Sequence, residues 1–254
     1  MNILKKLIYY HVLPIVGRVF SARNRYCNVI YYHDVVQGEG DSYMKINLAR
    51  FKEQMLYLKS QGYETVTFND LNKSTSKISY SPRRVLITFD DGWRSNFSEI
   101  FDWMCQMGIR YNIFLTMGKI GTDPLYLDWS EVKKMSDSGM VGFGIHTYTH
   151  PDLSQDGQFD AELEFTQAND LFIQHLGTQP TDFCYPYGKY SSQIQNYLIE
   201  NKFYPRIYTS DLTYTYPVGE ALVFGRNAIS NDYPIKVFRN KLRGYYNIFK
   251  SLRG

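Results

Sequence analysis

The stretch "LITFDDGW", Leu86 to Trp93, places two adjacent aspartates at the end of an apolar run. Its first four residues suit a buried strand, because β-branched and aromatic residues fit a pleated, packed surface. Two carboxylates side by side make each other harder to ionise. A solvated turn or a helix N-cap would accommodate such a pair, and so would a cation bound beside it.

Strand and helix patterns alternate along the chain. Short apolar runs indicate strands at 28–33, 64–68, 85–89, 111–115, 141–145, 181–185 and 204–208. Apolar residues at helical spacing, with an N-cap such as Asn47 and a glycine end such as Gly62, predict helices at about 48–61, 95–107, 130–138, 161–172 and 192–201. About seven such units in one domain favour a closed or nearly closed parallel barrel over an open sheet.

Polar side chains follow several of these strands. His33 follows the first strand and Asp90 and Asp91 follow "LITF", while "HTYTH" (146–150) and "CYPYG" (184–188) follow later strands. In a parallel barrel the catalytic groups lie at the C-terminal ends of the strands. We therefore expect these residues to share one site.

His146 and His150 are four residues apart. On a helical turn this spacing puts both imidazoles on one face, as in metal-binding pairs, although many such pairs are surface or core histidines. Two imidazoles and one carboxylate, with open positions for water, form the usual ligand set of a hydrolytic zinc site. The aspartate pair offers the carboxylate from a neighbouring strand end.

The two aspartates can then divide the work. One can bind the metal, while the other stays off it and accepts a proton from the metal-bound water, whose pKa the ion lowers to about 7. The cation also removes the cost of holding two carboxylates ionised side by side. The pattern alone leaves open which aspartate does which.

Three motifs, "TFDDG" (88–92), "HTYTH" and "YPYG" (185–188), occur in this order. Together they resemble the polysaccharide deacetylase family, carbohydrate esterase family 4 with the NodB homology domain. The resemblance covers about 28–229 and is nearest the branch that acts on poly-N-acetylglucosamine. It implies an α/β fold, a distorted (β/α)7 barrel, and hydrolysis of an N-acetyl group on an amino sugar to give a free amine and acetate.

The resemblance also implies roles for the motif residues. Asp90 matches the general base, and the metal ligands match Asp91, His146 and His150. The implied cofactor is a divalent ion, first of all Zn²⁺, with Co²⁺, Ni²⁺ and Mn²⁺ as alternatives.

The chain departs from the family pattern at two points. Cys184 stands where the third motif normally begins with an arginine that orients the base. The late Leu-x-His motif that supplies the general acid is missing, since the last histidine is His175, inside a predicted helix. The poly-N-acetylglucosamine branch takes its acid from a histidine after an N-terminal strand. His33 in "YYHDV" matches it, and its alternative role is structural, bonding across the barrel mouth. A small buried filler is the expected role of Cys184, in preference to a nucleophile.

Five further residues are candidates for contacts with the substrate. The resemblance places Pro186 and Tyr187 there, with the backbone N–H of Tyr187 helping to stabilise the oxyanion. Trp93 and Trp129 could form an apolar wall or a stacking platform for a sugar, or simply pack in the core. Arg226 follows a late short strand and could touch the substrate or an aspartate, or form a salt bridge. Asp128 and Asp152 are expected to be solvated loop acids.

The net charge of +3 hides an uneven distribution. Residues 1–26 hold five basic residues and 236–254 hold six, with no acid in either segment, so 27–235 carries 17 basic against 25 acidic residues. We expect three parts: a basic, apolar N-terminal segment (1–26), a deacetylase domain (27–235) and a basic amphipathic tail (236–254). The ends could lie on an anionic membrane surface, although a docked or frayed N-terminal helix and a tail packed on the barrel are alternatives.

The three cysteines are widely spaced and form no CxxC pair, so the sequence supports neither a disulfide framework nor a cysteine zinc site. They favour a reducing compartment. The apolar run at 7–17 is too short to span a membrane, and no convincing cleavage site follows it. We expect a cytoplasmic protein, peripheral at the inner membrane face, with an exported form as the alternative.

The sequence as a whole predicts a metal-dependent N-deacetylase. Its expected partner is an N-acetylated amino sugar in a polysaccharide or a lipid-linked glycan, and no nucleic-acid partner is expected. Two alternatives remain: a non-catalytic glycan-binding barrel, and a deformylase or amidase of the same fold.

Overall fold

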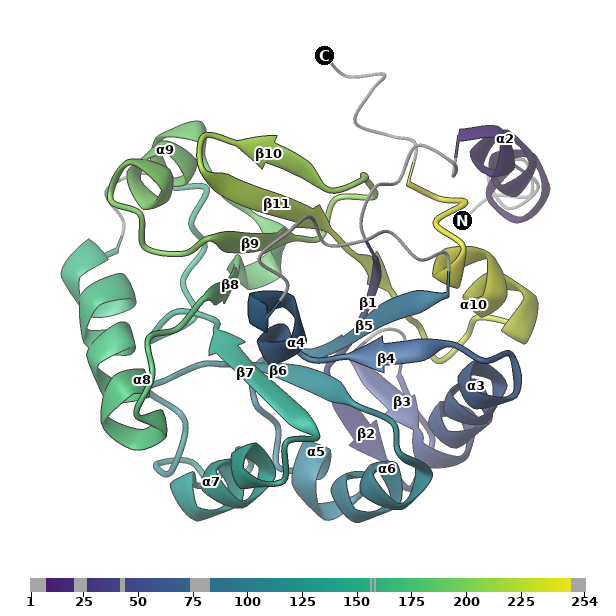
Figure 1. The fold of residues 1–254 in the computed structure, drawn as a ribbon, viewed down its shortest axis with the longest axis horizontal. Coiled ribbons are helices and arrows are strands. Elements are labelled where there is room, and N and C mark those ends of the chain that lie inside the picture. Colours follow the sequence, from purple (N-terminus) through teal and green to yellow (C-terminus); the bar gives the residue numbers. More distant parts are fainter. Residues whose placement is uncertain are drawn as a thin grey trace.

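A computed structural model describes residues 8–20, 27–41, 44–73, 83–155, 157 and 159–247 of the chain. Figure 1 shows strands arranged around a common centre, with helices outside them. The predicted basic ends lie partly outside the described residues, at 1–7, 21–26 and 248–254.

Seven parallel strands form the barrel, as predicted. Along the sheet they are β1 (Asn28–Tyr32), β5 (Arg84–Phe89), β6 (Tyr111–Leu115), β7 (Val141–Ile145), β8 (Asp182–Cys184), β9 (Arg206–Thr209) and β11 (Ala221–Gly225). One residue after β11, the chain continues as β12 (Asn227–Ala228), which pairs in parallel with β1. The last strand therefore pairs with β9 along its first part and with β1 along its second, and this closes the ring.

The predicted strand at 64–68 is shorter and lies off the closed path. It is β4 (Glu64–Val66), which pairs only with the first half of β5, while β6 pairs with the last residues of β5. The Asn112 side chain fills the gap where β5 and β6 separate, because it donates to the carbonyls of Val66 and Ile87 and accepts from the backbone N–H of Phe68. The seventh barrel strand is β11 instead.

The helices follow the predicted pattern with local differences. They are α3 (Leu48–Ser60), α4 (Phe68–Lys73), α5 (Ser95–Ser98), α6 (Phe101–Met107), α7 (Trp129–Asp137), η3 (Glu162–Gln167) with α8 (Ala168–Leu176), η4 (Pro186–Gly188) and α9 (Ser192–Glu200). Asn47 caps α3 by accepting from the N–H groups of Ala49 and Arg50, as predicted. The single helix expected at 95–107 is two, since the backbone at the buried Ile100 is not helical.

Asp128 differs from the expectation of a solvated loop acid. Its side chain accepts from the N–H of Glu131, whose carboxylate in turn accepts from the N–H of Asp128. This reciprocal pair is a capping box, and it fixes the start of α7.

Short strands complete the fold: β10 (Tyr216–Val218) pairs with β11, and β2 (Asp34–Val36) pairs with β3 (Lys45–Asn47). One buried cluster, which includes Val29, Leu86, Phe114 and Tyr208, also contains Phe68 of α4. Figure 1 shows α4 in front of the barrel centre. We infer that aromatic side chains fill the interior and that α4 covers the N-terminal end, so the C-terminal ends of the strands remain for a site.

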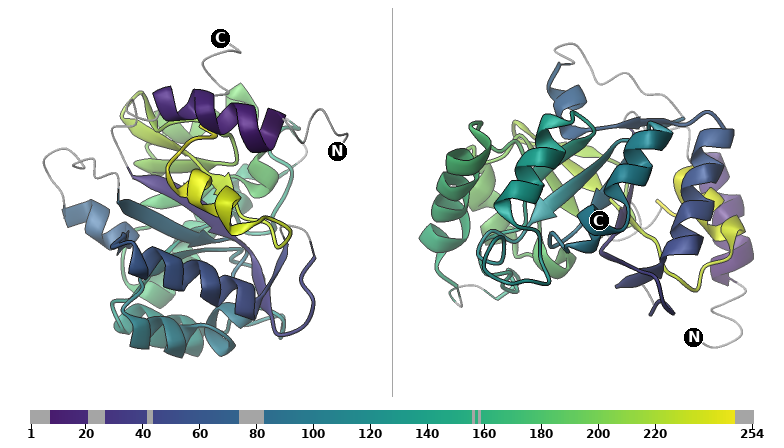
Figure 2. Two further views of the ribbon diagram at one scale, coloured as in Figure 1. Left: turned by 90° about the vertical axis from the view of Figure 1, so that its right-hand side faces the viewer. Right: turned by 90° about the horizontal axis from the view of Figure 1, so that it is seen from below.

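The terminal segments pack on one side of the barrel (Figure 2). They are η1 (Ile8–Val12), α2 (Leu13–Phe20) and α10 (Ile235–Leu242), and the expected domain boundary at 235 falls on the first residue of α10. Val237, Phe238 and Leu242 of α10 are buried, and the Asn28 side chain of β1 donates to the Leu242 carbonyl. None of the helices in the described residues is long and apolar enough to cross a membrane.

Candidate active site

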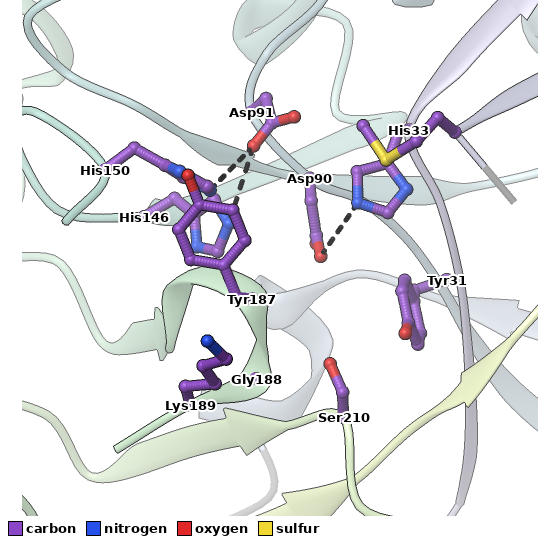
Figure 3. Close-up of a pocket in the computed structure, with 11 residues that line it drawn as sticks. Tyr31, His33, Asp90, Asp91, His146, His150, Tyr187, Gly188, Lys189 and Ser210 are labelled. Carbon is purple, nitrogen blue, oxygen red and sulfur yellow. Dashed lines mark ion pairs between the residues drawn. The ribbon is translucent and has the colours of Figure 1, made fainter. Parts of the chain in front are cut away.

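A pocket of about 330 Å³ lies at the C-terminal ends of the barrel strands (Figure 3). The residues that line it include all the histidines and aspartates that the sequence predicts to share one site. The full lining is Tyr31, His33, Met44, Asp90, Asp91, His146, His150, Tyr187, Gly188, Lys189 and Ser210. The prediction that these strand ends converge on one cavity is confirmed for every strand that carries a motif.

The Asp91 backbone turns sharply where β5 ends. Asp91 has φ 74° and Gly92 has φ 85°, in the left-handed region. The turn separates the carboxylates of Asp90 and Asp91. The indole N–H of Trp93 donates to Oδ2 of Asp91 at 3.0 Å, which leaves Oδ1 facing His146 and His150.

The "HTYTH" segment is a loop and not a helical turn, so the i, i+4 spacing is not what pairs the imidazoles. Thr147 and His150 have φ of 65° and 69°, which no helix allows. The loop is held instead by the buried carboxylate of Glu164, which accepts from the N–H groups of Tyr148 and Thr149 at 2.9 Å. The two imidazoles still meet, with ring centroids 4.8 Å apart.

Asp91, His146 and His150 fit a divalent metal ion. Asp91 Oδ1 lies 3.6 Å from Nε2 of His146 and 3.3 Å from Nε2 of His150, close to the ~3.3 Å that separates ligand atoms around a tetrahedral ion at about 2.0–2.1 Å. This oxygen is buried and has no well-aligned hydrogen-bond donor among the residues that the structure describes. A cation would satisfy it.

The His146 imidazole is neutral, and its Nε2 atom faces the pocket. Its Nδ1 lies 2.7 Å from the backbone carbonyl of Cys184, so Nδ1 carries the proton and Nε2 offers its lone pair. Burial, followed by the charge of His150, lowers the pKa of His146 to about 4. The imidazole is therefore neutral near pH 7, the form that binds metals.

Asp90 is held by a buried arginine. Nη1 and Nη2 of Arg226 donate to the two carboxylate oxygens at 2.6 and 2.8 Å, which is the bidentate geometry of a strong charge-assisted pair. Arg226 also donates to the Thr209 carbonyl and to Thr88, and its guanidinium lies 4.3 Å from the ring centroid of Tyr31. It is 0% exposed.

The pair controls the charge of Asp90. Burial alone would raise the pKa of Asp90, but the charge and hydrogen bonds of Arg226, with His146 and His33 adding to them, hold it below its usual 3.8. Asp90 is therefore ionised at neutral pH.

The sequence placed Arg226 among the substrate-binding residues, whereas the structure puts it behind Asp90 and outside the pocket lining. It contacts an aspartate and forms a salt bridge with it, which were two of its three expected roles. Arg226 also replaces the arginine that the family pattern places at the position of Cys184. The guanidinium that orients Asp90 comes from between β11 and β12 instead of from β8. The Cys184 side chain is completely buried, and burial raises the pKa of its thiol well above the usual value. Cys184 is therefore buried, as the filler role predicts.

His33 faces Asp90 across the pocket (Figure 3). Its Nε2 lies 3.9 Å from Oδ2 of Asp90. The side chain of Asn96 donates to the His33 carbonyl at 3.0 Å, and the Tyr31 ring meets the imidazole edge-on at 5.7 Å. These contacts place one imidazole nitrogen in the cavity.

The other predicted substrate contacts divide into two groups. Tyr187 lines the pocket, is 64% exposed, and its ring meets His150 edge-on at 4.5 Å. Pro186 is buried beside it and does not line the pocket. Trp93 supports Asp91 and stacks on Tyr126, and Trp129 stacks on His175, so both tryptophans pack in the structure instead of facing the cavity.

Sequence reasoning missed several residues around the site. Tyr31 could have been found, because it precedes His33 by two and therefore shares its face of β1. Ser210 and Lys189 follow strand or loop ends without a distinctive pattern, and Lys189 pairs at the rim with Asp152, which was expected to be solvated only. Glu164 could have been suspected only weakly, because the sequence places this acidic residue next to the apolar face of the helix predicted at 161–172.

Comparison with known proteins identifies the class. A model of the polysaccharide deacetylase family matches residues 77–204, just over half of the chain. The chain therefore belongs to the polysaccharide deacetylase family.

The curated relatives are distant. Bacillus subtilis YxkH is 26% identical over 65% of this chain and 58% of its own length. A peptidoglycan-N-acetylglucosamine deacetylase from Bacillus cereus is 24% identical over 61% of this chain and 54% of its own. A chitin deacetylase from Arthroderma benhamiae is 28% identical over 53% of this chain and 37% of its own. The chain thus spans about half the length of these relatives, or less.

Solved structures share the fold. Streptococcus pyogenes deacetylase PplD, solved in complex with acetate, superposes with a TM-score of 0.75 at 17% identity, over 86% of this chain and 99% of that one. IcaB from Ammonifex degensii gives a TM-score of 0.70 at 23% identity, over 86% and 97%.

Proposed function

We propose that this protein is a metal-dependent N-deacetylase that hydrolyses the acetamido group of an N-acetylated amino sugar. The observation that carries the proposal is the meeting of two groups in one pocket: Asp91 Oδ1 with two histidine Nε2 atoms, and Asp90 held ionised beside them. Family membership supports the reaction class, and the names of the chitin and peptidoglycan-N-acetylglucosamine deacetylases support the sugar.

Asp91, His146 and His150 would hold the ion, with Zn²⁺ as the first choice for this ligand set and Co²⁺, Ni²⁺ or Mn²⁺ as alternatives. When bound, the ion would supply a Lewis acid that polarises the acetyl carbonyl and acidifies water. Burial alone would raise the pKa of Asp91, but the three histidines around it outweigh this effect and hold the pKa well below its usual range. The carboxylate is therefore charged and can bind a cation.

Asp90 would act as the general base. It lines the pocket beside Asp91 and also lies within reach of His146 and Cys184, but it forms no group with His150. Arg226 fixes both of its oxygens and keeps it ionised, so it can accept a proton from the attacking water without moving. A base that is preorganised in this way costs little reorganisation at the moment of reaction.

His33 would be the general acid that protonates the leaving nitrogen. It reaches the pocket from the strand opposite the histidine loop, on the far side of Asp90 from Asp91 (Figure 3). A leaving amine must gain a proton before it departs, and histidine is the side chain that most often serves as a general acid. The N–H of Tyr187 would help to stabilise the oxyanion, and its exposed ring offers an aromatic face to the sugar.

Release of acetate tests the proposal. Protein stripped of metal by a chelator would be incubated with N-acetylglucosamine oligomers and with lipid-linked N-acetylated sugars, with and without Zn²⁺, and acetate and formate would be measured. We expect acetate from at least one substrate, only with metal, and none from Asp91→Asn. A formylated amide would be assayed in parallel: formate from it, with no acetate from the other substrates, would indicate a deformylase. Tight glycan binding without release of either acid would indicate a binding barrel.

A further inference from the structure

The N-terminal helix α2, with the turn η1 before it, is apolar on two opposite faces. The inner face carries Leu13, Pro14 and Gly17, and Pro14 and Gly17 are buried. A Cβ on Gly17 would overlap the Tyr245 carbonyl, so only glycine lets the helix lie directly on the segment that follows α10. This face accounts for the docking of the helix on the barrel.

The outer face leaves apolar side chains in water. Ile8, Val12, Ile15 and Val16 are 41%, 46%, 71% and 41% exposed, and their spacing places them on one stripe. We call these four residues the outer stripe. They are four of the seven exposed large hydrophobic residues in the described part of the chain, and the other three, Leu56, Leu125 and Tyr187, come from separate elements. Exposed apolar side chains that gather in one place mark a contact surface, whereas scattered ones do not.

A basic groove runs along one edge of the outer stripe. It has a volume of about 590 Å³ and lies between α2 and α10, and Ile15 of the stripe also lines it. Its cationic lining comes from Arg18, Lys236 and Arg243, with His11 beside them. Residues 1–26 and 236–254 contain no acidic residue, so no carboxylate from these segments neutralises the groove.

We propose that α2 is an interfacial helix that lies in the surface of an anionic lipid bilayer. The outer stripe enters the acyl boundary, and the groove cations meet the phosphate groups at headgroup depth. Apolar side chains bordered by cations, with no acidic residue among them, match the two layers of a bilayer surface, which are the hydrocarbon of the acyl chains and the phosphates of the headgroups. A helix of eight residues with a short π-helical turn lies on a bilayer and does not span it. The inference stands independently of the catalytic proposal.

Binding of the full-length protein to vesicles tests the inference. Flotation would compare phosphatidylcholine vesicles with vesicles in which about a third of the lipid is phosphatidylglycerol. We expect binding to the anionic vesicles, weakened by salt and much weaker on phosphatidylcholine alone. The paired variant Ile15→Ser with Val16→Ser should lower the partition coefficient at least about tenfold, because it removes apolar side chains from the acyl boundary. Arg18→Gln with Lys236→Gln should lower it by a similar factor on anionic vesicles only.

Matched controls separate this surface from general effects. Leu56→Ser removes an exposed apolar residue from α3, and Lys133→Gln with Lys202→Gln removes two exposed cations elsewhere. Both controls should bind like the wild type, and all variants should keep the wild-type melting temperature. Wild-type binding to no vesicle, or unchanged binding by the stripe variant, would overturn the inference. So would a concentration-dependent dimer that the stripe variant abolishes, because the stripe would then be covered by a second copy of the chain.

Discussion

Asp90 and Asp91 are neighbours in the chain, but their carboxylates face different partners. The left-handed turn at Asp91 sends one carboxylate to two histidines and the other to Arg226. The sequence could predict that the pair, the histidines and His33 converge, because parallel strands end at one rim. It could not assign Arg226, which lies 136 positions from Asp90 and belongs to no local motif.

The Arg226 pair predicts a change in pH dependence. Arg226→Met removes the charge that offsets burial, so the pKa of Asp90 should rise and the acidic limb of kcat/KM should move to higher pH. We expect kcat near pH 7 to fall about 10²-fold or more. Arg226→Lys keeps the charge and loses the bidentate geometry, so its limb should move less.

The measurement is the pH profile of acetate release, with circular dichroism to confirm folding. A folded Arg226→Met variant whose acidic limb stays at the wild-type position would contradict the role of Arg226 in setting the charge of Asp90.

His33 should affect turnover without affecting metal binding. His33→Gln removes the proposed proton donor from the pocket but leaves Asp91, His146 and His150 in place. We expect kcat to fall about 10²–10⁴-fold, the usual contribution of a general acid, while zinc content by atomic emission stays at the wild-type level. Near-normal turnover would show that another group protonates the leaving nitrogen.

At the scale of elements, local patterns predicted most helices and strands, and tertiary contacts decided the rest. Asn47 caps α3 where the sequence predicts a cap, and α6 ends at Met107, the last residue of the helix predicted at 95–107. The "HTYTH" spacing suggested a helical turn, but Glu164, from a later helix, fixes a loop instead. The predicted strand at 64–68 is present but ends at Val66, where the Asn112 side chain accepts from Phe68 and donates to Val66 and Ile87.

Glu164 should control metal affinity through the loop. Glu164→Gln removes the charge that orders the N–H groups of Tyr148 and Thr149, so His150 should be held less firmly. Loss of such a supporting contact typically costs about 10–100-fold in metal affinity. Zinc titration by calorimetry would measure it, with Glu162→Gln, an exposed neighbour on the same helix, as the control. Equal affinities for the two variants would refute the supporting role.

Helix α10 contains a buried cation with a stability cost. Burial lowers the pKa of Lys241 from 10.5 to about 7, and the ammonium group lies 5.1 and 5.2 Å from the ring centroids of Tyr233 and Tyr246. Between these two pKa values the unfolded chain binds more protons than the folded chain, so Lys241 makes the free energy of unfolding rise as the pH rises. Below pH 7 the lysine is charged in both states, and the full cost of burying the charge lowers stability.

Lys241→Met should therefore stabilise the fold by about 1–4 kcal/mol at pH 7, and the gain should shrink as the pH approaches 10.5. Urea unfolding at both pH values would measure it. The exposed Lys236→Met on the same helix should change little at either pH. A Lys241→Met gain that is equal at pH 7 and pH 10.5 would exclude burial of the charge as its cause.

At the scale of the whole molecule, the number of βα units predicted a barrel, and the structure has one. The sequence could not predict how the barrel closes, because the last strand pairs with β9 through β11 and with β1 through β12. Arg226 lies at that division, between β11 and β12. The residue that links the two pairings is therefore also the one that holds Asp90, so closure of the barrel and orientation of the Asp90 carboxylate depend on the same backbone.

A zinc titration of metal-free protein, followed by acetate release from N-acetylglucosamine oligomers, tests metal dependence at Asp91, His146 and His150 directly. We expect activity to rise with bound zinc and to level off at one equivalent. The Asp91→Asn variant, folded but unable to complete the ligand set, should neither bind zinc tightly nor release acetate. Full activity in the metal-free protein, or an Asp91→Asn variant as active as the wild type, would show that this site holds no catalytic metal.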